Sequence, residues 1–108
     1  MVERIEAIAR EHDLLIGTFG HAGDGNLHPT CVLDPSDEAA VQRAHRAFDE
    51  IFAAAIGLGG TITGEHGVGL SKLPWLERYL GTEHVALLRR IKAAFDPQGL
   101  LNPGKLGS

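Results

Sequence analysis

The apolar residues of this chain recur at two spacings, and each spacing predicts a different kind of element. Residues 1–13 place apolar side chains three or four positions apart between charged ones, which predicts an amphipathic helix over Met1–Asp13. Two short apolar and β-branched runs follow at Leu14–Phe19 and Leu27–Leu33, with a glycine-rich stretch between them. We expect these runs to pair as an antiparallel hairpin.

A longer helical pattern begins after Asp34-Pro35 and runs to about Ala55. Asp34 would cap this helix and Pro35 would take its first helical position. One stripe of apolar residues should pack on the sheet; its members are Val41, Ala44, Phe48, Ile51, Phe52 and Ala55. The glycines of residues 57–60 should end the helix and lead into a short strand over Thr61–Thr63.

Two further helices are predicted in the last third of the chain. One begins at a turn near Ser71 to Pro74 and runs through Leu80. Thr82 should cap the other, Glu83–Phe95, whose inward residues would be Val85, Leu88, Ile91 and Phe95. Residues 99–105 should form an irregular loop that buries its two adjacent leucines. Helices alternating with a few short strands indicate the α+β class.

Composition limits the classes of function. A chain of 108 residues is one domain at most, and the net charge of -4, without a basic cluster, excludes nucleic acid and an anionic membrane as partners. Cys31 is the single cysteine, so no internal disulfide forms and a cytoplasmic location is expected. No signal-peptide pattern and no transmembrane segment is present. The first helix has no N-cap signal, which suggests that the sequence starts inside a longer chain.

Candidate chemistry lies in two glycine-rich motifs. Residues 20–29, Gly-His-Ala-Gly-Asp-Gly-Asn-Leu-His-Pro, contain His21 and His28, and residues 63–69, Thr-Gly-Glu-His-Gly-Val-Gly, contain Glu65 and His66. Glycine is costly in ordered structure and accumulates where the backbone turns tightly or approaches a ligand. Two imidazoles and one carboxylate form a facial ligand set for a divalent metal, and His66 could accept a proton beside it. The hairpin would bring His21 and His28 together.

Other polar residues have simpler explanations. The remaining histidines are assigned no function, Asp24 is interpreted as a turn former, and Cys31 as a small buried apolar residue. Lys72 is either a solvated charge or a cationic partner for a carboxylate substrate, and the sequence slightly favours the second. The same ligand set also serves metallohydrolases and non-haem iron oxygenases, and a stand-alone metal-binding module stays open.

The two motifs, followed by Asn102-Pro-Gly-Lys105, resemble the C-terminal part of FAD-linked oxidases of the D-lactate dehydrogenase, glycolate oxidase and D-2-hydroxyglutarate dehydrogenase type. The resemblance covers residues 14–105. It implies a ferredoxin-like cap with an antiparallel sheet and helices on one face, so that residues 1–108 would be a single C-terminal domain fragment. The FAD-binding domain would be missing from this chain.

The resemblance also implies roles for individual residues. His21, His28 and Glu65 would bind a divalent metal, taken to be zinc, and His66 would be the general base that takes the hydroxyl proton of a 2-hydroxy acid while hydride goes to FAD. Asn26 would orient the substrate, and Asn102 would lie against the flavin. The isolated chain is expected to bind no FAD and to be inactive.

Overall fold

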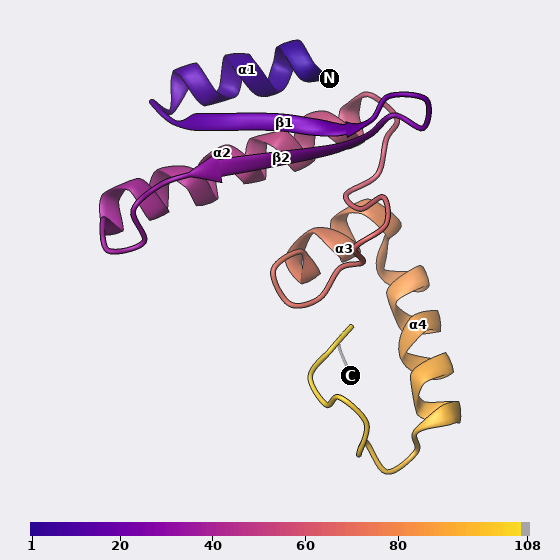
Figure 1. Ribbon diagram of the computed structural model, residues 1–108. Helices are drawn as coiled ribbons and strands as arrows, with labels where there is room; N and C mark the ends of the chain where they lie inside the picture. Colours follow the sequence, from indigo (N-terminus) through magenta and orange to yellow (C-terminus); the bar gives the residue numbers. More distant parts are fainter. Residues whose placement is uncertain (107–108) are drawn as a thin grey trace. The chain divides into compact units, whose positions relative to one another are not determined.

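The computed structural model describes residues 1–106, and the chain divides into two compact units, Met1–Gly60 and Thr61–Ser108. The first unit contains helix α1 (Val2–Glu11), strands β1 (Leu15–His21) and β2 (Asn26–Val32), and helix α2 (Glu38–Gly57). The second contains helices α3 (Leu73–Leu80) and α4 (Thr82–Phe95). Figure 1 labels these elements. Four helices and a two-stranded antiparallel sheet within residues 1–106 confirm the predicted α+β class.

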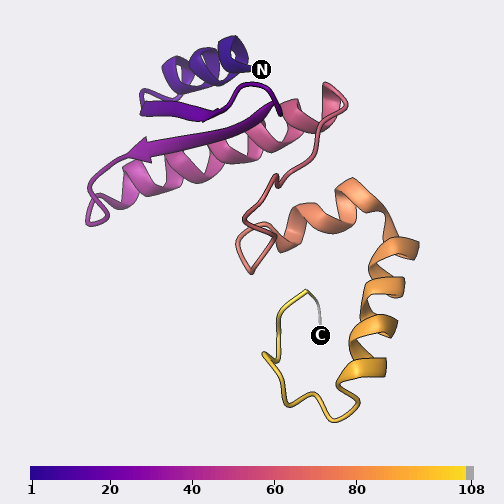
Figure 2. The same ribbon diagram turned by 45° about the vertical axis from the view of Figure 1, so that its right-hand side comes forward.

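The core of the first unit forms where α1 and α2 meet one face of the hairpin. Ile5 and Ile8 of α1 pack with Ala47 and Ile51 of α2, and all four side chains are buried. Partly buried side chains around this cluster include Ile16 of β1 and Leu27 of β2. Figures 1 and 2 both show α1 alongside β1 and α2 running along the hairpin. The opposite face of the hairpin lies away from this core and is not part of the buried cluster.

The hairpin was predicted, and the structure confirms it with strands that reach further toward the turn than expected. β1 pairs with β2 from Leu15 opposite Val32 to His21 opposite Asn26. Residues 22–25 form the turn, which is closed by a hydrogen bond from the Asp24 amide to the His21 carbonyl oxygen at 3.0 Å. Asp24 is therefore a turn residue, as predicted.

The predicted cap of the long helix was wrong. Helix α2 begins at Glu38, and its N-cap is Asp37, whose side chain accepts a hydrogen bond from the Ala40 amide at 3.1 Å. The Asp34 carboxylate instead accepts hydrogen bonds from the hydroxyl and the backbone amide of Ser36. These bonds close a local turn and lower the pKa of the Asp34 carboxyl group. The predicted apolar stripe is confirmed at Ala44 and Ile51, which are buried.

The second unit departs from the prediction in three places. Residues 61–63 are not a strand, although Ile62 is buried. Helices α3 and α4 were both predicted, but Thr82 is the first residue of α4 and makes no side-chain cap. Val85 is buried as expected. Ile91 and Phe95 are exposed, and Phe95 has an exposed fraction of 85%. No helix within residues 1–106 is long and apolar enough to cross a membrane.

Candidate metal centre

The face of the hairpin that turns away from the core presents both histidines of the first motif. Side chains alternate between the two faces of a strand, and directly paired residues share a face. Phe19 pairs with His28, and His21 pairs with Asn26, so these four side chains lie on one face. Ile16 and Leu27, which pack on the core, lie on the other. The strand register therefore places both histidines on the face opposite the core.

The two imidazole rings lie close together, as the hairpin predicts. Their centroids are 6.0 Å apart and their planes meet at 77°, so that one ring presents its edge to the other. The His21 side chain is exposed and the His28 side chain is half-buried. His28 also has Phe19 stacked on its ring. Two imidazoles in this position are suitable ligands for one metal ion.

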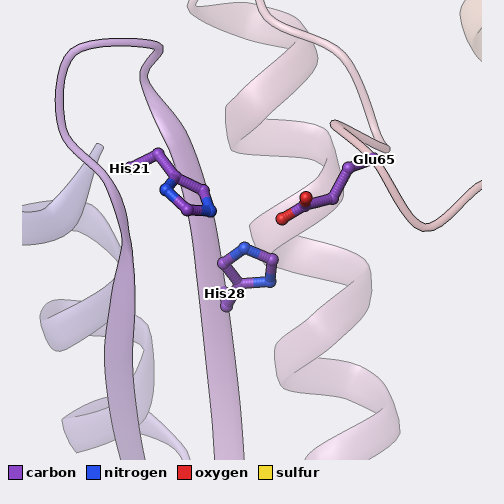
Figure 3. Close-up of side chains that lie close together, drawn as sticks. All are labelled: His21, His28 and Glu65. Atoms are coloured by element: carbon purple, nitrogen blue, oxygen red, sulfur yellow. The ribbon is translucent and has the colours of Figure 1, made fainter.

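Glu65 supplies the third candidate ligand. One ligand atom from each of His21, His28 and Glu65 lies within 4.8 Å of the other two, and Figure 3 shows the three side chains. Donors bound to one zinc ion sit at about 2.0–2.2 Å from the metal, so the three residues are candidates for ligands of one ion. The donor set, two imidazole nitrogens and one carboxylate oxygen, fits a divalent metal and leaves positions for a substrate.

Gly20 is required for the strands to approach each other beside the histidines. A Cβ atom at Gly20 would lie 2.0 Å from the backbone oxygen of Asn26 and 3.0 Å from the Cα of Leu27. Both are backbone atoms of the partner strand, so no side-chain rotation relieves the overlap. The glycines of this motif were expected to permit tight turns or contact with a ligand, and Gly20 instead permits contact between the two strands.

Gly20→Ala should distort the end of the hairpin. We expect it to destabilise the fold by roughly 1–3 kcal/mol, as overpacked sites do. It should also weaken metal binding, because His21 and His28 would no longer hold their mutual position. Thermal unfolding and zinc titration measure the two effects. Gly17→Ala is the matched control, since it lies on the same strand and its Cβ would meet nothing within 4 Å. Equal losses in both variants would contradict the explanation.

The other predicted site residues occupy defined positions, and their roles stay predictions. Asn26 begins β2 opposite His21. His66 is exposed and follows Glu65 directly in the sequence, and Asn102 is exposed in the C-terminal tail. Lys72 directly precedes α3, and burial lowers the pKa of its ammonium group. Cys31 is half-buried rather than buried, and its thiol pKa is raised by desolvation.

The tail that leads to Asn102 is organised by Asp96, the residue that directly follows α4. Its side chain is 6% exposed and accepts hydrogen bonds from the Lys92 ammonium and from the Leu100 and Leu101 amides. Lys92 also donates to the Leu101 carbonyl oxygen. The side chains of Leu100 and Leu101 are 71% and 64% exposed, so the expectation that they are buried was wrong. Backbone hydrogen bonds, rather than apolar burial, hold this loop.

Acid should loosen the tail through Asp96. Its hydrogen bonds from Lys92 and from the Leu101 and Leu100 amides lower its pKa to about 2, below the usual value of about 3.9. A carboxyl group whose pKa is lowered in the folded chain stabilises the fold at pH values above its pKa in the unfolded chain. This stabilisation is lost as the pH falls through the pKa in the folded chain. We therefore expect the Leu100 and Leu101 amide resonances to shift cooperatively between about pH 4 and pH 2. Asp96→Asn should remove this transition, and Asp34→Asn should leave it unchanged.

Comparison with known proteins identifies the family. Residues 1–106 match the family of FAD linked oxidases, C-terminal domain. The chain belongs to this family. A FAD-linked oxidase C-terminal domain was expected from the two glycine-rich motifs and the Asn-Pro-Gly-Lys tail, and that prediction is confirmed.

Relatives of this FAD-linked oxidase domain include two glycolate oxidase subunits and a D-lactate dehydrogenase. This chain is 56% identical over 106 residues to the glycolate oxidase subunit GlcD of Bacillus subtilis, and the match covers 98% of this chain and 23% of that protein. It is 36% identical to the Escherichia coli K12 protein of the same name, covering 97% of this chain and 21% of that protein. It is 41% identical to the mitochondrial cytochrome-type D-lactate dehydrogenase of Arabidopsis thaliana, covering 98% of this chain and 19% of that protein. The chain thus spans about a fifth of the length of these relatives.

The described residues do not fit a whole FAD molecule. Dinucleotide sites of the strand–turn–helix type place a glycine-rich turn between a strand and a helix, so that the helix N-terminus meets the phosphates. In residues 1–106, the glycine-rich turn after β1 leads into β2 rather than into a helix. The tail offers Asn102, which adopts a left-handed backbone conformation with φ of 44°. A single tail residue can contact a flavin but cannot hold the cofactor.

Two residues of this region escaped the sequence prediction. Phe19 was interpreted as an ordinary strand residue, although its position two residues before His21 places it opposite His28 once the hairpin register is known. Asp96, which directly follows α4, was not singled out in the sequence. The strand register identifies Phe19 as the neighbour of His28. The hydrogen bonds of Asp96 depend on loop geometry, which residue spacing in the sequence does not predict.

Proposed function

We propose that this chain is the C-terminal substrate-site and metal-site portion of a flavin-dependent oxidoreductase that oxidises a 2-hydroxy acid, such as glycolate or D-lactate, to the 2-oxo acid. The supporting observation is the His21–His28 pair on one face of the hairpin, grouped with Glu65. Membership of the FAD-linked oxidase family supports the flavin chemistry. The names of the relatives support the choice of a 2-hydroxy acid as substrate.

Each predicted site residue has a task in this proposal. His21, His28 and Glu65 would hold a divalent ion, zinc, which when bound lowers the pKa of a substrate hydroxyl group. His66 accepts the proton of that hydroxyl group on an imidazole nitrogen, which is the common role of histidine near neutral pH. The flavin of the complete enzyme would supply the hydride acceptor.

The two asparagines serve orientation. Asn26, opposite His21 at the end of the hairpin, orients the substrate through its side-chain amide. Asn102 contacts the flavin from the tail loop, whose backbone Asp96 and Lys92 hold. Because neither asparagine transfers a proton, replacing either one should lower the catalytic rate less than replacing His66.

The finer architecture is also a proposal. A two-stranded hairpin alone is marginally stable in water, and here α1 and α2 pack on one of its faces. This arrangement supports a larger ferredoxin-like domain to which residues 1–108 contribute, with the FAD-binding domain outside these residues. A cytoplasmic location stays a prediction that rests on the single cysteine.

The same three ligands would also suit a metallohydrolase, in which the metal activates water, or a stand-alone metal-binding module. Neither alternative accounts for the match of residues 1–106 to FAD-linked oxidases. Flavin-dependent oxidation therefore has the stronger support.

Flavin reduction tests the proposal in a complete flavoenzyme that contains this domain. Anaerobic mixing with glycolate or D-lactate should bleach the flavin absorption band, and prior removal of metal with a chelator should abolish bleaching until zinc is returned. Undiminished bleaching after thorough chelation would remove the metal from the mechanism. The isolated 108-residue chain should be colourless when purified, and a flavin band in it would contradict the assignment of FAD binding to other residues.

A further inference from the structure

Phe19 has a direct contact with one of the proposed metal ligands. It lies opposite His28 in the hairpin, and both side chains are on the face that turns away from the core. Their ring centroids are 5.2 Å apart and the ring planes meet at 12°, so the two rings are stacked. The contact joins neighbouring strands at directly paired positions, where side chains interact most strongly.

Burial does not explain this phenylalanine. Its side chain is 65% exposed, and the cluster that forms the core of the unit does not include it. An exposed aromatic ring gains little from the hydrophobic effect. The Phe19 ring instead stacks on His28, with the two rings in the nearly parallel arrangement that aromatic pairs can adopt.

A stacked neighbour constrains an imidazole without occupying its nitrogens. Phe19 contacts the face of the His28 ring, whereas a metal ion binds an imidazole nitrogen in the plane of the ring. His21 meets His28 at 77°, so the ring of His28 has one aromatic neighbour parallel to it and another steeply inclined. Together these contacts limit rotation of the His28 ring about its side-chain bonds.

We propose that Phe19 is a positioning residue for the metal ligand His28, which it holds in a binding orientation by stacking. The inference rests on the proposed function, because it requires His28 to be a ligand. A ligand whose ring is already fixed loses less rotational freedom when the ion binds. The expected effect is a threefold to tenfold tighter affinity for the ion, about the size of one aromatic pair interaction.

Zinc titration of the 108-residue chain tests this proposal. Phe19→Leu keeps an apolar side chain but removes the ring, and it should weaken zinc affinity about threefold to tenfold while leaving the midpoint of thermal unfolding unchanged. Phe19→Tyr keeps the ring and should restore wild-type affinity. Cobalt(II), used in place of zinc, should show an altered visible absorption spectrum in Phe19→Leu and a wild-type spectrum in Phe19→Tyr, because the spectrum reports the geometry of the ligands.

Leu15→Ala is the matched control, since Leu15 lies on the same strand and the same face and is 68% exposed. It should leave zinc affinity unchanged, and a loss equal to that of Phe19→Leu would overturn the proposal. His28→Ala distinguishes the positioning role of Phe19 from the metal site itself. If His28→Ala weakens binding but Phe19→Leu does not, the positioning role is wrong and the metal site stands. If His28→Ala has no effect, the metal site itself is wrong.

Discussion

Replacing His66 with alanine in a complete flavoenzyme that contains this domain should slow flavin reduction by about 10²- to 10⁴-fold, the usual contribution of a general base. Substrate affinity should change much less, because the base acts on the proton only as the transition state forms. Stopped-flow flavin reduction at increasing 2-hydroxy acid concentration separates the limiting rate from the concentration that gives half of it.

His84→Ala is the matched control for this substitution. His84 is also an exposed histidine of the second unit, in the first turn of α4, and no role is assigned to it. The enzyme with His84→Ala should reduce its flavin at the wild-type rate. A His66 variant with near-normal reduction would remove His66 from the role of base, whatever the result for the metal ligands.

Replacing Glu65 with alanine should give a different kinetic signature. Loss of a metal ligand removes both the ground-state contact between ion and substrate and the stabilisation of charge in the transition state. We therefore expect the half-saturating substrate concentration to rise and the limiting rate to fall, with the combined loss exceeding about 10²-fold. Bound zinc, measured in the same samples, should fall in parallel.

The control for Glu65→Ala is Glu77→Ala, which removes an exposed carboxylate from α3 in the same unit. Zinc content and both kinetic constants should be unchanged in that variant. A Glu65 variant that retained full zinc but lost activity would show that the carboxylate serves the reaction in some way other than as a ligand.

The sequence predicted the position of the histidine pair because the pair depends on local rules. Two short strands joined by a glycine-rich turn can pair in few ways, and a hairpin register that places His21 opposite Asn26 also places His28 on the same face. Family membership was predictable for a similar reason, since the residues of each motif are close in sequence.

Errors arose where two local choices compete or where an element depends on a partner. Asp34 and Asp37 are both able to cap a helix, and the bonds to Ser36 commit Asp34 to a turn while Asp37 caps α2. The β-branched residues 61–63 favour a strand, but a strand needs a neighbour, and within the described residues β1 pairs only with β2.

Exposed apolar side chains show the remaining limit of prediction from sequence. Ile91 and Phe95 follow helical spacing, so they were expected to face inward, yet both are exposed in the second unit. Periodicity identifies the side chains that share a face of a helix, but it does not identify a surface that would cover them. Leu100 and Leu101 were mispredicted for a different reason, since hydrogen bonds to Asp96 fix their backbone and their side chains are exposed.

The central claim is that His21, His28 and Glu65 bind a metal ion, and the zinc content of the purified chain after dialysis tests it most directly. We expect weak binding of one zinc ion per chain in the wild type and little zinc in His28→Ala. His45→Ala, which removes an exposed histidine from α2, should retain the wild-type amount. Equal zinc content in the wild type and His28→Ala would contradict the account.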